Sequence, residues 1–218
     1  MKKSQFDYKL YYRRNLPHIQ PVDAVFFITY CLQFDLPDDF IKAASLRKKE
    51  FNDNIKTLSE KELADKKYSF NKKQFIIWDD FIANYNNTSE WLTKPEIAAL
   101  IIESLKYRDR EEYELICYCI MPNHVHILIK PNQKSDDKPF SLARIMKNHK
   151  SYTAVKANKI LNRKGQFWQR DYYDHYIRNK KEFYNVIRYI LDNSVRAGFV
   201  DDYKDWKYSW VDEECIKL

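Results

Sequence analysis

Glycine is almost absent from this sequence, since only Gly165 and Gly198 occur among its 218 residues. Loops that bind nucleotide phosphates need several closely spaced glycines, because the backbone must approach the phosphate without side chains in between. The sequence therefore contains neither a P-loop nor a dinucleotide-binding loop, and hydrolysis of a nucleotide in a P-loop is excluded.

Long apolar runs are missing as well. No stretch approaches the ~20 apolar residues that cross a membrane as a helix, and the first residues, Met1-Lys2-Lys3-Ser4-Gln5, lack the apolar core of a secretion signal. Cysteine is scarce, and the four thiols are expected to be reduced because disulfides are typical of exported proteins. We therefore expect a cytoplasmic protein with no membrane partner.

The charged and aromatic residues favour an acidic polymer as the partner. Lysine and arginine total 38 against 31 aspartate and glutamate, which gives a formal charge of +7 and a pI of about 9.0. Aromatic side chains make up 16% of the residues, and their rings can stack on unpaired bases or fill the core. The length and the 44% apolar content suit one globular domain.

Periodicity along the chain predicts alternating strands and helices. Pro95 marks a helix start, and Met121-Pro122-Asn123 between two apolar runs predicts a β-hairpin. Between about 36 and 90 the composition is charged and lysine-rich, with helical spacing from Lys42 to Leu58, which predicts a helical insertion. Strands are expected at 24–32, 113–120, 124–130 and 172–177, and helices from 95, at 141–161 and at 181–193.

This order of elements is typical of the ferredoxin-like or RRM-like fold. The elements follow one another as strand, helix, strand, strand, helix, strand and a further helix, which is the split β-α-β pattern. We expect an α+β fold in which an antiparallel sheet carries helices on one face, with an extra C-terminal helix. A single domain over residues 1–218 is expected, with the charged helical insertion at about 36–90. Because this fold serves many functions, particular residues must decide the function.

His124-Val125-His126 falls on the third expected strand and is a candidate metal site. Alternate side chains of a strand point to the same face, so both imidazoles can bind one ion. The Pro122-Asn123 turn before the pair and the apolar residues after it make the strand rigid, as a metal site requires. Two neutral nitrogens are too few for a closed structural zinc site, so further ligands are needed and open positions suit catalysis. Two ordinary strand histidines are the alternative interpretation.

Three blocks of the sequence occur in the same order in a known family. They are Tyr118-Cys119-Ile120-Met121-Pro122-Asn123-His124-Val125-His126-Ile127-Leu128-Ile129, Phe167-Trp168-Gln169-Arg170-Asp171-Tyr172-Tyr173-Asp174-His175-Tyr176-Ile177-Arg178 and Tyr189-Ile190-Leu191-Asp192-Asn193-Ser194-Val195-Arg196-Ala197-Gly198. The first block resembles the His-hydrophobic-His motif of single-tyrosine transposases. Taken together, the blocks resemble the REP-associated tyrosine transposases over most of the chain except the insertion.

The resemblance implies a covalent mechanism. The family's nucleophile is a tyrosine on the helix after the fourth strand, which corresponds to Tyr189, and its third metal ligand corresponds to Asn193. Residues four apart share a helix face, in agreement with this assignment. Ser194 stands where many relatives have proline, so Asp192 or another carboxylate is an alternative ligand. The implied reaction joins Tyr189 to a 5' phosphate and frees a 3' hydroxyl. Two imidazoles and an amide oxygen suit Mg²⁺ or Mn²⁺.

The resemblance also implies the partner. Hairpin-forming single-stranded DNA is the implied substrate, and a homodimer is implied because related transposases often pair. Basic side chains are expected to contact phosphates, and aromatic rings to stack on unpaired bases. The candidate phosphate contacts are Arg13, Arg14, Lys147, Lys150 and Arg178.

Two alternative functions stay open. One is a zinc-binding module of Cys117, Cys119, His124 and His126, whose thiols and imidazoles are zinc ligands. A two-residue hairpin turn would place the cysteines on the histidine face, and a three-residue turn would place them on the other face. We expect the three-residue turn, because it directs the small thiols towards the helices. The other alternative is a non-catalytic DNA- or RNA-binding domain of the same fold.

Overall fold

The computed structural model describes residues 11–13, 17–55, 59–85, 89–134 and 138–216, and the chain divides into two compact units. The smaller unit consists of residues 34–88, and the larger unit of residues 1–33 and 89–218. The smaller unit corresponds to the charged segment that the sequence sets apart. All residues assigned to a site from the sequence belong to the larger unit.

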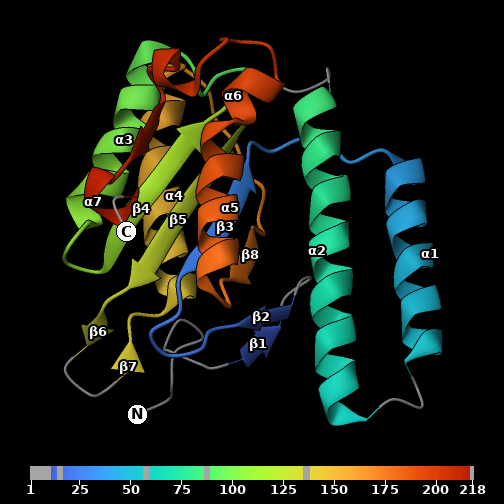
Figure 1. The fold of residues 1–218 in the computed structure, drawn as a ribbon. Coiled ribbons are helices and arrows are strands. Elements are labelled where there is room, and N and C mark those ends of the chain that lie inside the picture. The colour runs from blue at the N-terminus through green and yellow to red at the C-terminus, as the bar shows by residue number, and fades with distance from the viewer. Residues whose placement is uncertain (1–10, 14–16, 56–58, 86–88, 135–137, 217–218) are drawn as a thin grey trace, which may run out of the picture. The chain divides into compact units, whose positions relative to one another are not determined.

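The smaller unit is a pair of helices, α1 (Asp38–Asn54) and α2 (Glu60–Asn84), which run side by side in Figure 1. Aromatic rings join the two helices. Phe40 stacks on Phe81 and Phe51 stacks on Phe70, with ring centroids 4.1 Å apart in both pairs. The expectation that this insertion is helical is therefore confirmed.

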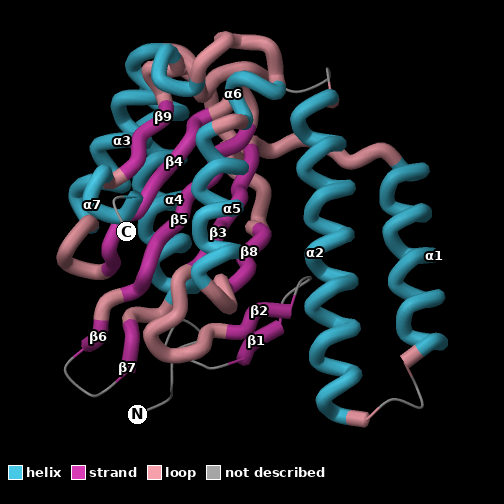
Figure 2. Tube along the Cα trace, in the orientation of Figure 1, coloured by secondary structure: helices cyan, strands magenta, loops and turns pink. Residues whose placement is uncertain are grey.

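A five-stranded antiparallel sheet forms the centre of the larger unit (Figure 1). Its strands in spatial order are β8 (Tyr173–Tyr176), β3 (Phe26–Cys31), β5 (His124–Pro131), β4 (Tyr113–Ile120) and β9 (Ser209–Val211). In the chain, α3 (Pro95–Arg108) follows β3 and α4 (Leu142–Ile160) follows β5. This connectivity is ferredoxin-like, so the predicted α+β fold is confirmed. Figure 2 shows the unpredicted strand β9 beside β4.

The two faces of the sheet carry different helices. α3 and α4 cover one face, and α5 (Lys180–Leu191) covers the other, in front of the sheet in Figure 1. Strand alternation decides what each helix meets, because successive side chains point to opposite faces. Phe26, Ile28 and Tyr30 of β3 join the core with α3 and α4, whereas Phe27 and Thr29 lie on the face of α5.

Short elements complete the larger unit. They are β1 (Tyr11–Arg13), β2 (Pro17–Ile19), β6 (Gln133–Lys134), β7 (Lys138–Pro139), α6 (Asn193–Arg196), the 3-10 helix η1 (Tyr203–Asp205) and α7 (Glu213–Ile216). Within the described residues, no helix combines the length and the apolarity that crossing a membrane requires. The cytoplasmic location expected from the sequence stays a prediction.

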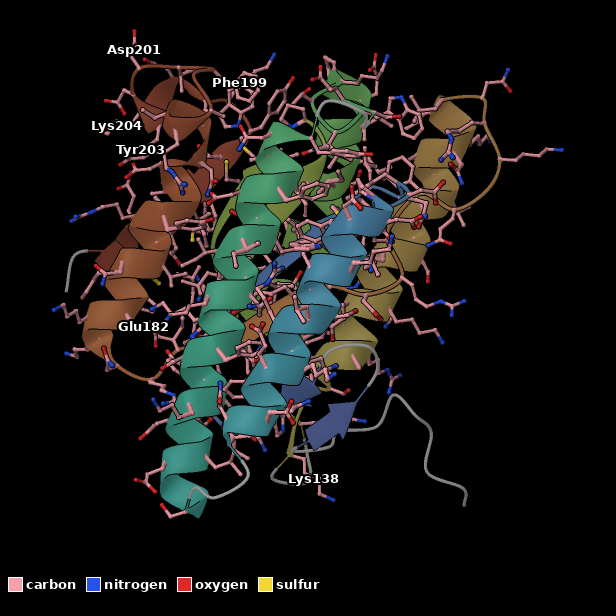
Figure 3. The ribbon with its side chains drawn as sticks, turned by 90° about the vertical axis from the view of Figure 1, so that its right-hand side faces the viewer. Lys138, Glu182, Phe199, Asp201, Tyr203 and Lys204 are labelled. Atoms are coloured by element: carbon pink, nitrogen blue, oxygen red, sulfur yellow. The ribbon has the colours of Figure 1, made fainter. Side chains whose placement is uncertain are left out.

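The start of α5 is tied to the sheet. The Oδ1 atom of Asn179 accepts a hydrogen bond from the Glu182 amide at 3.0 Å, which caps the helix. The Glu182 carboxylate, labelled on α5 in Figure 3, accepts from the Arg178 amide at 3.0 Å and lies 3.1 Å from Nε2 of His175 on β8. The helix therefore has a fixed position over the sheet at its first turn.

The end of α5 continues into α6. Asp192 joins the two helices, and Ser194 lies inside α6. The helical path ends at Gly198, whose φ of +74° suits glycine. The Phe199 amide donates to the Ser194 carbonyl at 3.0 Å and closes the helix end around this glycine. The helix that the sequence places at 181–193 therefore extends by one further turn.

His149 on α4 ties three elements together inside the core. Its Nε2 atom lies 2.7 Å from the Tyr30 hydroxyl of β3, and its Nδ1 atom lies 3.0 Å from the Ser104 hydroxyl of α3. Burial, with smaller contributions from Arg108 and Lys150, lowers the pKa of His149 from 6.5 to about 3. The folded protein therefore keeps this imidazole neutral in mild acid.

The stability of the fold should depend on pH through His149. The unfolded chain binds a proton there below about pH 6.5, whereas the folded chain does so only near pH 3, so stability is lost as the pH falls between these values. In His149→Gln, the slope of the unfolding free energy against pH should be smaller by about 1.4 kcal/mol per pH unit. Urea unfolding at several pH values measures both slopes, and equal slopes would contradict this role.

Candidate active site

The hairpin between β4 and β5 determines where the two histidines point. The Met121 amide donates to the His124 carbonyl at 2.8 Å, which leaves Pro122 and Asn123 as a two-residue turn. His124 and His126 then project from one face of β5, and their Nε2 atoms lie 3.1 Å apart. Both side chains are buried. The two imidazoles therefore converge, as their alternation along the strand predicts.

The other ring nitrogen of each histidine also has a partner. Nδ1 of His124 lies 2.6 Å from Oδ1 of Asn123, which can only accept, so His124 donates from Nδ1 and its Nε2 carries a lone pair. Nδ1 of His126 lies 2.8 Å from the Thr29 hydroxyl of β3, which can accept in the same way. Such partners fix the orientation of a metal-binding imidazole and direct Nε2 towards the ion.

This pair of nitrogens fits a divalent cation. An octahedral ion with ligands at ~2.1 Å holds neighbouring ligand atoms about 3 Å apart, and the two Nε2 atoms are separated by 3.1 Å. Desolvation, with a smaller contribution from the positive charge of Arg196, lowers the pKa of His126 from 6.5 to about 3. Because metals bind neutral imidazole, protonation of His126 does not compete with an ion at neutral pH.

Tyr189 lies on α5 beside the histidine pair. Its ring centroid is 5.9 Å from that of His126 and 5.9 Å from that of Phe27, with an edge-on arrangement in both cases. Ile187 and Ile190 of the same helix are buried, whereas Tyr189 is only partly buried. The predicted nucleophile and two predicted metal ligands thus come together on one face of the sheet.

Asn193 begins α6, one helical turn after Tyr189, and is buried. Its Nδ2 atom donates to the Tyr189 carbonyl at 2.7 Å, so Oδ1 is the atom through which it can bind an ion. The backbone of the next residue, Ser194, lies beside the thiol of Cys119, which pairs with His126 across the strands. This contact holds the start of α6 over the strand next to the histidines.

Sequence reasoning missed two residues of this cluster. The guanidinium of Arg196 lies 5.1 Å from the centroid of the Tyr189 ring. Arg196 follows Tyr189 by seven residues, a spacing that places both on one face of a continuous helix. This spacing could have identified Arg196 from the sequence. Thr29 was missed because only the pairing of β3 with β5 places it opposite His126.

The hairpin register overturns our expectation for the cysteines. With the observed two-residue turn, Cys119 lies opposite His126, so the three-residue turn expected from the sequence is wrong. Tyr118 and Ile120 instead enter the large core with α3 and α4, where bulky apolar side chains are buried. Burial raises the pKa of Cys119 to about 12 and that of Cys117 well above its usual value, which disfavours the thiolates that bind zinc.

The five basic residues expected to contact phosphates lie in different places. Lys147 and Lys150 lie on α4, where both line one groove. The Nζ atom of Lys150 donates to three backbone carbonyls, at distances from 2.7 to 3.3 Å, so this lysine also has a structural role. Arg178 is exposed just before α5. Arg13 belongs to β1, of which only the backbone is described, and Arg14 lies outside the described residues.

A known protein family matches the part of the chain that contains His124, His126 and Tyr189. Residues 81–193, a little over half of the chain, match the family described as "Transposase IS200 like". The chain belongs to the IS200-like transposase family. The matched part of this transposase-family chain contains His124, His126, Tyr189 and Asn193, together with the strands and helices that hold them.

REP-associated tyrosine transposases are among its relatives, so the resemblance drawn from the sequence blocks is confirmed. A Haemophilus influenzae protein of this group is 30% identical over 102 residues, which are 44% of this chain and 58% of that protein. The Escherichia coli REP-associated tyrosine transposase is 24% identical over 129 residues, covering 59% of this chain and 73% of that one. The alignment thus spans little more than half of the Haemophilus relative.

A solved structure of a REP-associated tyrosine transposase bound to a REP hairpin shares the fold. The two structures superpose with a TM-score of 0.51 at 18% sequence identity, over 91% of this chain and 80% of the other. At this identity the similarity concerns the arrangement of strands and helices. The roles of particular residues therefore depend on the geometry of this chain.

Proposed function

We propose that this IS200-like chain cleaves and rejoins single-stranded DNA through a covalent bond between Tyr189 and a 5' phosphate. The observation that carries the proposal is the position of the Tyr189 ring, 5.9 Å from the ring of His126, whose Nε2 converges with that of His124. A nucleophile beside a pair of metal ligands is an arrangement suited to attack on a phosphodiester.

Tyr189 supplies the attacking oxygen in this proposal. Its hydroxyl loses a proton and bonds to phosphorus, the bond from phosphorus to the 3' oxygen breaks, and that oxygen gains a proton. Reversal of these steps rejoins the strand, so the phosphotyrosine conserves the bond and no ATP is needed. Arg196, 5.1 Å from the ring of Tyr189, places positive charge beside the phenolate as it develops.

The proposed ligands suit Mg²⁺ or Mn²⁺. His124 and His126 offer two neutral nitrogens, Asn193 offers an amide oxygen, and the remaining positions suit phosphate oxygens. Such an ion, when bound, polarises the phosphate as a Lewis acid and orients the leaving oxygen. Asn123 and Thr29 hold the two imidazoles in the orientation that binding requires.

Thr29→Val should weaken metal binding without unfolding the protein. Valine has the shape of threonine, but it removes the hydroxyl that lies 2.8 Å from Nδ1 of His126. Loss of such a partner typically lowers metal affinity about 10- to 100-fold. Isothermal titration with Mn²⁺ measures the affinity, and Thr29→Ser, which keeps the hydroxyl, is the matched control. Equal affinities of the valine variant and the wild type would show that Thr29 does not orient His126.

Hairpin-forming single-stranded DNA is the proposed substrate. The relative of known structure is described as bound to a REP hairpin, and the charge of +7 on this chain suits a polyanion. A homodimer, which the resemblance implies, belongs to the same proposal. Sedimentation velocity of the purified protein tests the oligomeric state.

Covalent capture of DNA tests the proposed function. Labelled single-stranded hairpin oligonucleotides from DNA flanking the gene are incubated with the protein and Mg²⁺ or Mn²⁺, and the mixture is then denatured. We expect a denaturation-resistant protein–DNA adduct that forms with a divalent ion and is absent in EDTA. Binding without an adduct in either ion would favour the alternative function, a non-catalytic nucleic-acid-binding domain of the same fold.

A further inference from the structure

A groove with a volume of about 450 Å³ lies between α4 and the segment 165–172 of the larger unit. This volume falls within the range of sites that bind small molecules. The groove exists because small residues line it, namely Ser151 and Ala154 on α4 and Gly165 on the opposite wall. A bulky side chain at any of these positions would fill it.

The wall opposite α4 is held in place at both ends. Near one end, Nζ of Lys150 donates to the carbonyls of residues 169–171, at 2.7 Å for the first of them. At the other end, Nδ2 of Asn158 donates to the Gly165 carbonyl at 2.8 Å. Both ties connect the wall directly to α4. The groove is therefore a preformed feature of the fold.

The lining of the groove has two parts of different polarity. Met146, Phe167 and Trp168 contribute a buried apolar floor. Lys147 and Arg170 are exposed, and they place positive charge at the rim. Among the described residues that line the groove there are three cations and no carboxylate. An anion joined to a flat apolar ring is the ligand that this combination fits.

We propose that the groove binds one unpaired nucleotide of a DNA strand, with its base on the apolar floor and its phosphate at the cationic rim. The wall of the groove is hydrogen bonded to the end of β3. The Gln169 amide donates to the Cys31 carbonyl at 2.9 Å, and Cys31 pairs with His124 across the strands. The groove lies on the α4 side of the sheet, and its wall is thus joined to the end of β3 that pairs with His124. That the nucleotide belongs to a DNA substrate rests on the proposed function.

Charge reversal at the rim tests the phosphate contact. In Lys147→Glu/Arg170→Glu, the affinity for a labelled single-stranded oligothymidine should fall at least about tenfold and should depend less on salt. Fluorescence anisotropy in EDTA measures binding without cleavage. The matched control is Lys156→Glu/Lys159→Glu, which changes the charge equally at exposed positions of α4 outside the groove. Equal losses of affinity in the two double variants would overturn the proposal.

Filling the groove tests the contact with the base. Ser151→Trp should weaken binding of oligothymidine and leave binding of an abasic oligonucleotide of the same length unchanged. Ala154→Leu is a smaller occluding change for the same comparison, and thermal unfolding reports whether each variant folds. If the folded variants bind both oligonucleotides with the affinity of the wild type, the groove does not bind the base. These binding assays contain no metal ion, so they do not depend on strand cleavage. A missing adduct in the covalent-capture experiment would therefore contradict the proposed function and would leave the inference about the groove unaffected.

Discussion

Tyr189→Phe is expected to abolish strand cleavage and adduct formation while DNA binding stays within about twofold of wild type. The substitution removes only the attacking oxygen, and the ring keeps its place 5.9 Å from the ring of His126. Because no other group takes over as the covalent nucleophile in this mechanism, the cleavage rate should fall at least about a thousandfold. Denaturing gels with a labelled hairpin oligonucleotide measure cleavage, and fluorescence anisotropy measures binding.

Two other tyrosines provide the comparison for Tyr189. Tyr184 lies on the same helix, and Tyr173 of β8 has its ring centroid 6.4 Å from that of Phe27 on the same face of the sheet. Tyr184→Phe and Tyr173→Phe should both retain the adduct. An adduct that persists in Tyr189→Phe and disappears in Tyr173→Phe would identify Tyr173 of β8 as the nucleophile.

His124→Ala and His126→Ala should have the second largest effect, on metal binding and cleavage together. Each variant removes one of two nitrogens that converge at 3.1 Å. Loss of a residue that only hydrogen bonds to a metal ligand typically lowers metal affinity about 10- to 100-fold. Removal of a direct ligand should lower it further, so we expect Mn²⁺ affinity to fall more than about 100-fold. Isothermal titration measures the affinity, and cleavage should become undetectable at Mn²⁺ concentrations that saturate the wild type.

His175→Gln is the matched control for these variants. His175 lies opposite Phe27 on the same face of the sheet, but its Nε2 atom lies 3.1 Å from the Glu182 carboxylate and it is no proposed ligand. The Mn²⁺ affinity of the His175→Gln variant should equal that of the wild type. If His124→Ala keeps wild-type affinity in a folded protein, His124 does not bind the metal.

Elements with local signals could be predicted from the sequence. Pro95 marked the start of α3, and the strands expected at 113–120 and 124–130 agree with β4 and β5 to within one residue. The convergence of His124 and His126 follows from the period of two in a strand, so it could be predicted without knowing what the strand pairs with.

Features that depend on distant segments could not be predicted. Thr29 and His126 are 97 positions apart in the chain, and only the register of β3 against β5 brings them together. The cysteines were assigned to the wrong face because the turn length depends on which side chains the whole core accepts. The strand β9 is only three residues long and pairs with β4 about 90 positions earlier in the chain, so its own residues gave no signal.

The identity of the residue that becomes bonded to DNA tests the central claim most directly. The adduct formed with a hairpin oligonucleotide is digested with nuclease and trypsin, and the modified peptide is sequenced by mass spectrometry. Arg188 and Arg196 bound a tryptic peptide, residues 189–196, in which Tyr189 is the single tyrosine. The mechanism predicts the nucleotide remnant on this peptide. A remnant on the peptide 182–188, which contains Tyr184, or on any other tyrosine peptide would contradict it.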